Sequence, residues 1–182
     1  MDEPRYLLAD AFVGVLNVAA AKALAVTAEP EEVVLAGDTT VVAEGQVVGK
    51  PEDAPAAREM LSMLRGRPHD VLSGVVLRRA DGRQWGAVVG TRVVMRPYTD
   101  VDIEQYVARG EPFDKAGGYA VQDAEFAPVE RVEACYLNVV GLPLCAVSAG
   151  LNALGIPARA AGAPPCDLCR AGEPLVSIRS GS

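Results

Sequence analysis

Several residue types and segments are scarce in this chain, and each scarcity excludes a class of protein. Aromatic residues make up 5% of its 182 residues although half of the residues are apolar, so valine, alanine and leucine must fill the core. No apolar run is long enough to cross a bilayer. The segment Met1–Arg5 lacks the basic start of a signal peptide. We therefore expect a soluble cytoplasmic protein without a membrane partner.

Positive charge is also in short supply. The chain has 17 Lys and Arg residues against 24 Asp and Glu residues, which gives a formal net charge of −7. Non-specific binding to nucleic acids depends on clustered positive charge, so we expect no nucleic-acid partner. A nucleotide ligand is not excluded, because it can arrive with Mg²⁺ and a few lysines can dominate the potential of a cleft.

Histidine and cysteine are both scarce, which disfavours the metal and hydrolase sites that use them. His69 is the only histidine, and no Gly-x-Ser-x-Gly nucleophile motif accompanies it, so we expect a hydrogen-bonded structural role. The four cysteines contain a single C-x-x-C pair, Cys166 and Cys169. One interpretation is a zinc ion bound by this pair together with Cys135 and Cys145. Reduced thiols are favoured, because structural zinc sites usually show two C-x-x-C pairs.

The order of sequence patterns predicts an α/β protein with a mixed sheet. We expect one domain over residues 1–157 and a Pro/Gly/Ala-rich tail over 158–182. The expected helices are Ala11–Val26, the stripe Ala57–Leu64, a helix opened by a Thr99/Asp102 capping box, and Leu144–Leu154. The expected strands are Val33–Ala36, a hairpin over Val41–Val48, His69–Leu77 and Trp85–Met95, the last two joined through Asp81-Gly82.

A polar cluster follows the apolar run Val33–Ala36. Gly37 ends that run, so Asp38 is predicted at the carboxyl end of a buried strand, where open α/β sheets usually place their ligands. The hairpin that follows should return Lys50 to the region of Asp38. An acid and a lysine near glycines suit a metal-bound polyphosphate, while a surface ion pair is the alternative.

A second polar cluster lies between Gly110 and Gln122. Asp114 and Lys115 precede the flexible pair Gly117-Gly118, and Gln122 follows a short β-like run. Charged groups beside glycines are typical of backbone held close to a ligand. An ordinary charged turn is the alternative, and the cluster around Asp38 favours the ligand interpretation.

These motifs together resemble a known family. The segments AGDTTVV, GKP, AAREMLSMLRGRPHDVLSGVVL, GEPFDKAGGYAVQ and NVVGLPL occur in this order and are similar to the Maf family of nucleoside triphosphate pyrophosphatases, which is related to the inosine triphosphate pyrophosphatases. The likeness covers about residues 3–155. It implies an elongated, bent sheet flanked by helices, two lobes with a nucleotide cleft between them, and homodimer formation.

The resemblance also implies a reaction and its residues. Water attacks the α-phosphorus of a nucleoside triphosphate and pyrophosphate leaves, with a divalent cation such as Mg²⁺ or Mn²⁺ as cofactor. Asp38 matches the proton acceptor, with metal contact as well. Lys22, Lys50 and Lys115 match lysines that serve the phosphate chain. Without the family, a solvated helix face would be the preferred interpretation of Lys22.

Thr39 and Gln122 bear on substrate choice. In the Maf branch that acts on dTTP and UTP, threonine follows the catalytic acid and the second motif carries glutamine, as here. A glutamine amide offers both a donor and an acceptor, as a pyrimidine edge requires. The resemblance therefore favours the pyrimidine branch over the branch that prefers N7-methylated GTP.

One departure from the family concerns the start of the chain. Maf proteins begin with a strand and a serine-rich, double-arginine loop, and this sequence has no such segment before Glu3, which matches the acid that follows that region in the family. Either the start of the sequence is truncated or misassigned, or the protein has lost the strand and loop, and a real loss would weaken catalysis and expose a strand edge. The alternative function is therefore a catalytically weak nucleotide-binding or regulatory protein linked to cell division.

Overall fold

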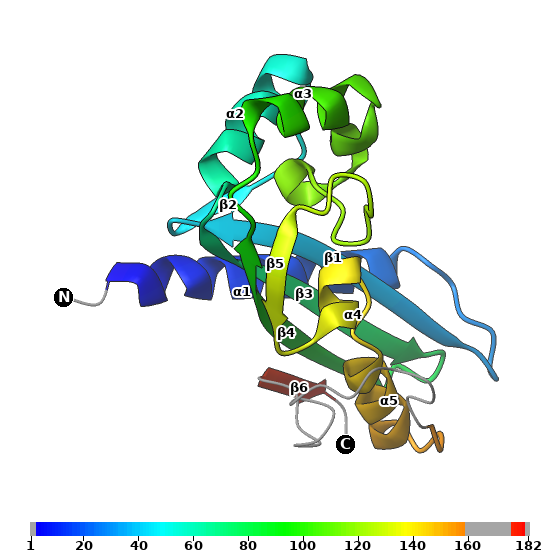
Figure 1. The fold of residues 1–182 in the computed structure, drawn as a ribbon. Helices are drawn as coiled ribbons and strands as arrows, with labels where there is room; N and C mark the ends of the chain where they lie inside the picture. The colour runs from blue at the N-terminus through cyan, green and yellow to red at the C-terminus, as the bar shows by residue number, and fades with distance from the viewer. Residues whose placement is uncertain (1–2, 159–175, 181–182) are drawn as a thin grey trace.

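The fold is a long β-sheet with helices on both faces. The computed structural model describes residues 3–158 and 176–180, with side chains described within residues 10–158. The sheet has the order β2-β1-β3-β4-β5, and β6 also pairs with β4 (Figure 1). Its strands are β1 (Val33–Ala43), β2 (Gln46–Val48), β3 (Pro68–Arg79), β4 (Gln84–Met95), β5 (Val129–Glu133) and β6 (Val176–Ser180).

The α/β class is confirmed, but two details of the predicted sheet are wrong. The pairings among the described strands are all antiparallel, where a mixed sheet was expected. The strand predicted to end at Ala36 continues through Gly37 to Ala43, so Asp38 lies in the middle of β1. The run before it is only partly buried, with Leu35 43% exposed, because this part of β1 lies at an edge of the sheet.

Helix α1 (Glu3–Leu24) covers one face of the sheet and begins earlier than the predicted residue Ala11. Its buried stripe Ala11, Val15, Ala19 and Ala23 packs on apolar residues of β1, β3 and β4. Gly74 of β3 permits this contact, because a Cβ atom there would lie 2.5 Å from the carbonyl oxygen of Val15. Within the described part of the chain, no helix is long and apolar enough to span a membrane.

The opposite face carries two groups of helices (Figure 1). At one end, α2 (Ala54–Leu64) and α3 (Asp100–Ala108) enclose a core with Val41, Val71 and Tyr119. At the other end, α4 (Tyr136–Val140) and α5 (Leu144–Ala153) contribute to a second apolar cluster, which contains Trp85. Two 3₁₀ turns, η1 (Glu111–Asp114) and η2 (Ala116–Gly118), follow α3.

Most helix boundaries follow their sequence signals. The predicted capping box of α3 is present, because Thr99 and Asp102 bond each other's backbone N–H groups. Helices α2, α3 and α5 occupy the predicted stretches. The sequence did not predict α4 or β5. The segment immediately before Gln122 forms turns, where a short β-like run was expected.

The segment predicted as a tail contributes a strand. Residues 176–180 form β6, which pairs with Gln84–Val88 of β4. Cys166 and Cys169 lie outside the described residues. The interpretation of a zinc site that includes them therefore stays a prediction.

Candidate functional site

A cleft of about 660 Å³ lies between the two groups of helices, at the edge of the sheet formed by β1. Its walls come from α1, β1, the segment after β2, the loop after α3, and α4. The predicted site residues that line it are Lys22, Asp38, Thr39, Lys50, Lys115 and Gln122. Glu3 is the first residue of α1, and its side chain lies outside the described residues.

Asp38 pairs with Lys22. The Lys22 ammonium donates hydrogen bonds to the Asp38 carboxylate at 2.7 Å and to the carbonyl oxygen of Gly37 at 3.2 Å. The Lys22 side chain is 54% exposed and that of Asp38 is 27% exposed, so both remain accessible from the cleft. The sequence predicted that the hairpin would bring Lys50 near Asp38; both line the cleft, but the direct partner of Asp38 is Lys22.

Asp38 and Thr39 project from opposite faces of β1, because successive side chains of a strand alternate. Val42 packs with the α1 side and Val41 packs with the α2 and α3 side, which assigns Asp38 to the first face and Thr39 to the second. Among the described strands, β2 pairs only with residues 41–43 of β1. The edge beside Asp38 and Thr39 is therefore open, and the cleft reaches both faces of β1 there.

The loop after α3 brings Lys115 to the opposite wall. The Lys115 ammonium donates to the Asp114 carboxylate at 2.6 Å and to the carbonyl oxygen of Glu111 at 2.7 Å. Burial opposes the charged form of Lys115, but its hydrogen bond to the Asp114 carboxylate and the nearby charges raise its pKa overall. The ammonium therefore stays protonated at neutral pH.

Gly117 joins this loop to the hairpin that carries Lys50. Its N–H donates to the carbonyl oxygen of Gly49 at 2.9 Å. Its φ is +76°, and a Cβ atom would lie 3.1 Å from a methyl group of Val41, so a side chain is disfavoured in both conformation and space. Glycine here fixes the relative positions of Lys50 and Lys115, and among the described residues the Lys50 ammonium makes no hydrogen bond or ion pair.

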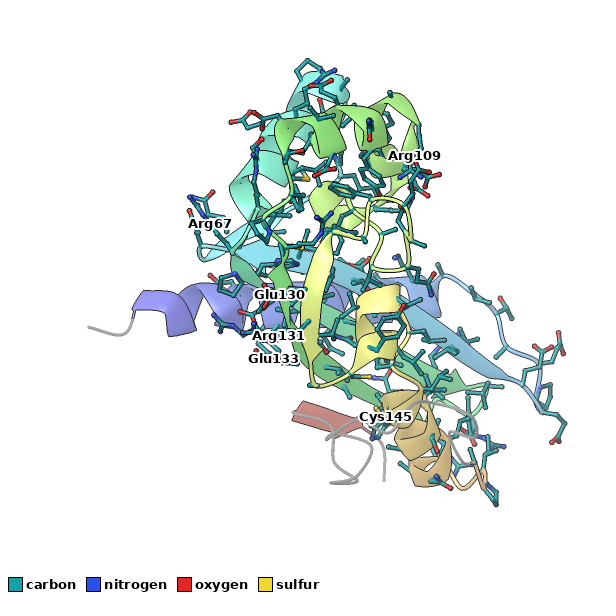
Figure 2. The ribbon with its side chains drawn as sticks, in the orientation of Figure 1. Arg67, Arg109, Glu130, Arg131, Glu133 and Cys145 are labelled. Atoms are coloured by element: carbon teal, nitrogen blue, oxygen red, sulfur yellow. The ribbon has the colours of Figure 1, made fainter. Side chains whose placement is uncertain are left out.

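Gln122 lies on an exposed turn that is held from outside the cleft. Arg109, at the end of α3, donates to both carboxylate oxygens of Asp123 at 3.0 Å and to Glu125 at 2.9 Å (Figure 2). The Asp123 carboxylate also accepts from the N–H of Phe126 at 2.7 Å. Burial would raise the pKa of Asp123, but these hydrogen bonds lower it overall, so the carboxylate remains ionised and anchors the turn.

A buried polar network behind the cleft was missed by the sequence reasoning. The Thr39 and Ser73 hydroxyls lie 2.7 Å apart. The Asn138 side chain, 0% exposed, donates to the carbonyl oxygen of Val71 at 2.9 Å and to the Thr91 hydroxyl at 3.0 Å. Two signals could have found it, namely a single serine within the apolar strand VLSGVVL and the asparagine of NVVGLPL.

His69 supports the wall of the cleft. It is buried, and one ring nitrogen lies 2.7 Å from the hydroxyl of Tyr119, a residue that lines the cleft. Burial, with a smaller effect from the charge of Arg92, lowers the pKa of His69 to about 4. A neutral, hydrogen-bonded histidine is the structural role that the sequence predicted.

The donor atoms of the cleft limit how a metal ion could be held. In the described residues, no group of three or more His, Cys, Asp or Glu side chains could bind a metal by itself. Mg²⁺ is commonly bound through one or two carboxylates together with substrate phosphates and water. Asp38 fits a cation of that kind, one that is shared with a phosphorylated ligand.

Fold and cleft define the class: this is an α/β protein with an acidic side chain among lysines at the open edge of its sheet. The sequence model of the family described as "Maf-like protein" matches residues 2–154. The chain belongs to the Maf family.

Individual relatives agree with this assignment. A protein of Thermomicrobium roseum described as dTTP/UTP pyrophosphatase is 50% identical over 128 residues, which cover 70% of this chain and 58% of the relative. A protein of Anaeromyxobacter dehalogenans with the same description is 50% identical over 146 residues, covering 79% and 74%. One of Dehalococcoides mccartyi is 43% identical, covering 75% and 63%. The chain thus spans less than two thirds of the length of two of these relatives.

Proposed function

We propose that the protein hydrolyses dTTP and UTP, or modified forms of these nucleotides, to the nucleoside monophosphate and pyrophosphate, a reaction that removes unwanted nucleotides from the pool. The observation that carries this proposal is the gathering of Asp38, Lys22, Lys50 and Lys115 around one cleft. Relatives described as dTTP/UTP pyrophosphatases support the choice of nucleotide.

The reaction needs a base, charge neutralisation and precise placement. The Asp38 carboxylate takes a proton from water as the water oxygen forms a bond to the α-phosphorus. The bond from the α-phosphorus to the oxygen that bridges to the β-phosphorus breaks, and pyrophosphate leaves with that oxygen. Lys22 orients the Asp38 carboxylate through the 2.7 Å contact, and Lys50 and Lys115 bind the departing phosphates.

Asp38 is the residue that would hold a divalent cation, together with oxygens of the phosphate chain. A Mg²⁺ or Mn²⁺ ion bound there supplies positive charge against the phosphates. The lysines supply the remaining positive charge. They are needed because a chain with a net charge of −7 otherwise repels a triphosphate.

The nucleoside is assigned to the remaining walls. Gln122 lines the cleft and its amide makes no hydrogen bond to the described protein residues, so both its donor and its acceptor are available for a pyrimidine edge. Val139, Val140 and Leu142 add an apolar surface on the α4 side against which a ring can pack.

The test is pyrophosphate release from dTTP, UTP and N7-methyl-GTP with Mg²⁺. Asp38→Asn keeps the shape of the side chain but removes the base, so we expect kcat to fall by about 10²- to 10⁴-fold. Asp10→Asn is the matched control, because Asp10 is an exposed carboxylate of α1 that does not line the cleft, and it should keep wild-type kinetics.

Three results would contradict the proposal in whole or in part. Equal activity of wild type and Asp38→Asn would remove Asp38 from the reaction. A wild-type protein that binds the nucleotides but releases no pyrophosphate would favour the alternative function, a regulatory nucleotide-binding protein. Preference for N7-methyl-GTP would keep the reaction class and reject the pyrimidine assignment.

A further inference from the structure

The Thr39 hydroxyl has two partners inside the protein. Its oxygen lies 2.7 Å from the Ser73 hydroxyl and 3.5 Å from the carbonyl oxygen of Gly141. Ser73 is 1% exposed, and its hydroxyl also lies 3.4 Å from the carbonyl oxygen of Asn138. Thr39 lines the cleft, so its hydroxyl connects this buried chain of hydrogen bonds to the ligand space.

The direction of these hydrogen bonds follows from a count of protons. Each hydroxyl has one proton to donate, and each carbonyl oxygen can only accept. If Ser73 donates to the carbonyl of Asn138, Thr39 donates to Ser73. If Ser73 instead donates to Thr39, Thr39 donates to the carbonyl of Gly141. In both arrangements the Thr39 proton is used within the protein, and Thr39 offers a ligand only a lone pair.

Position along β1 limits which ligand group can meet that lone pair. Asp38 is the preceding residue, and in the proposed reaction it serves the α-phosphate. The sugar is the part of a nucleotide that is joined directly to that phosphate. The base is joined to the other side of the sugar, and in the proposed function Gln122 and the α4 wall receive it. A sugar hydroxyl is a donor, and the 3′-hydroxyl is the one that dTTP and UTP share.

We propose that Thr39 accepts a hydrogen bond from the 3′-hydroxyl of the nucleotide sugar, and that Ser73 is a positioning residue that keeps Thr39 an acceptor. This inference rests on the proposed function and deepens it. It makes the open edge of β1 a sugar site, with Asp38 facing the phosphate from one face of the strand and Thr39 facing the sugar from the other.

The experiment compares dTTP with its 3′-deoxy analogue. We expect the wild type to show a KM about tenfold higher for the analogue, the loss of one hydrogen bond, with kcat little changed. Thr39→Val should raise the KM for dTTP and bring the ratio of the two KM values close to one. Thr39→Ser, which keeps the hydroxyl, should keep the preference.

Ser73→Ala and Thr40→Val complete the design. Ser73→Ala leaves only the longer contact to Gly141 for the Thr39 proton. The ratio of the two KM values should therefore fall between those of wild type and Thr39→Val. A purely structural effect would change the KM values of both nucleotides by the same factor. Thr40→Val is the matched control, because Thr40 is the next threonine of β1, has the opposite side-chain direction and does not line the cleft. It should keep the wild-type ratio.

The outcomes separate this inference from the proposed function. Equal KM values for the two nucleotides in the wild type, or an unchanged ratio in Thr39→Val, would overturn the sugar contact even in an active enzyme. If the wild type releases no pyrophosphate, the proposed function fails, and the same ratios, measured as Kd values by calorimetry with the two nucleotides, still decide the role of Thr39.

Discussion

Lys22 and Asp38, 16 residues apart in the chain, meet at 2.7 Å across the interface between α1 and β1. The ion pair forms because a stripe of small residues holds α1 close to the sheet, with Ala19 and Ala23 fully buried on either side of Lys22. The catalytic carboxylate proposed here is therefore oriented by a helix that packs on the sheet through a stripe of buried apolar side chains.

Lys22→Met should separate function from stability. Both side chains of the pair are partly exposed, and exposed ion pairs contribute about 0–1 kcal/mol to the free energy of unfolding. We expect urea denaturation to show a change within that range, while kcat/KM for dTTP falls by about tenfold or more because Asp38 loses its orienting partner. A mutant with reduced stability and normal kinetics would assign Lys22 a structural role only.

Gly117→Ala should damage both the fold and the site. At a φ of +76° an alanine costs about 1–2 kcal/mol, and its methyl group would press on Val41. The hydrogen bond to Gly49 would weaken, so we expect a lower Tm and a higher KM for dTTP.

Gly14→Ala is the opposing control for Gly117→Ala. Gly14 lies within α1, is exposed, and has no atom within 4 Å of an added Cβ. Alanine there should stabilise the protein by about 0.5–1 kcal/mol and leave the kinetics unchanged. If the two substitutions had similar effects on Tm, the assigned backbone constraint at Gly117 would be wrong.

Arg109→Met should act on Gln122 at a distance. Removal of the guanidinium releases Asp123 and with it the turn that carries Gln122, so Gln122 loses its fixed position. We expect the KM for dTTP to rise by about three- to tenfold with kcat little changed, because a binding contact and not the reacting centre is affected.

Arg131→Met is the control for Arg109. Arg131 forms two exposed ion pairs, with Glu130 and Glu133 on β5 (Figure 2), and it does not line the cleft. Steady-state kinetics of this variant should match the wild type. A comparable rise in KM in both variants would indicate a general effect of lost surface charge and not a local effect on the turn.

The sequence predicted the gathering of the site residues better than it predicted their contacts. Asp38 and Lys115 were named from motifs and Lys22 from the family resemblance alone, and all three line one cleft. The ion pair of Asp38 was not predicted, because it depends on how closely α1 packs on Gly74, a property of two segments that are distant in sequence. The predicted end of the strand at Ala36 was also wrong. A glycine after an apolar run usually indicates the end of a strand, but the residues on both sides of Gly37 pair with β3.

The polar network shows a different limit. Ser73 and Asn138 belong to motifs that the sequence reasoning quoted, but neither was given a role. Their contact requires α4 to lie over β3, and α4 is a helix of five residues with too few positions for a periodic signal. Alternation along β3 does place Ser73 on the same face as its cross-strand neighbour Thr39, so half of the network was accessible once the pairing was known.

His69 should make stability fall in mild acid. In the unfolded chain the histidine takes up a proton near its ordinary pKa of 6.5, whereas in the folded protein burial lowers the pKa to about 4. The unfolded state therefore binds more protons between these two values, so stability is lost as the pH falls through 6.5 and the loss levels off below 4. Between pH 7.5 and 5 we expect the free energy of unfolding to drop by about 2 kcal/mol.

Urea denaturation at the two pH values, in wild type and His69→Gln, measures this effect. A glutamine can still hydrogen bond to the Tyr119 hydroxyl but does not titrate, so the variant should be less stable than wild type at pH 7.5 and lose much less stability at pH 5. His69 is the only histidine of the chain, and no other side chain ordinarily titrates near pH 6.5. If the variant showed the same acid-induced loss as wild type, the loss would have to come from carboxylates, and the buried, neutral His69 beside Tyr119 would not be its source.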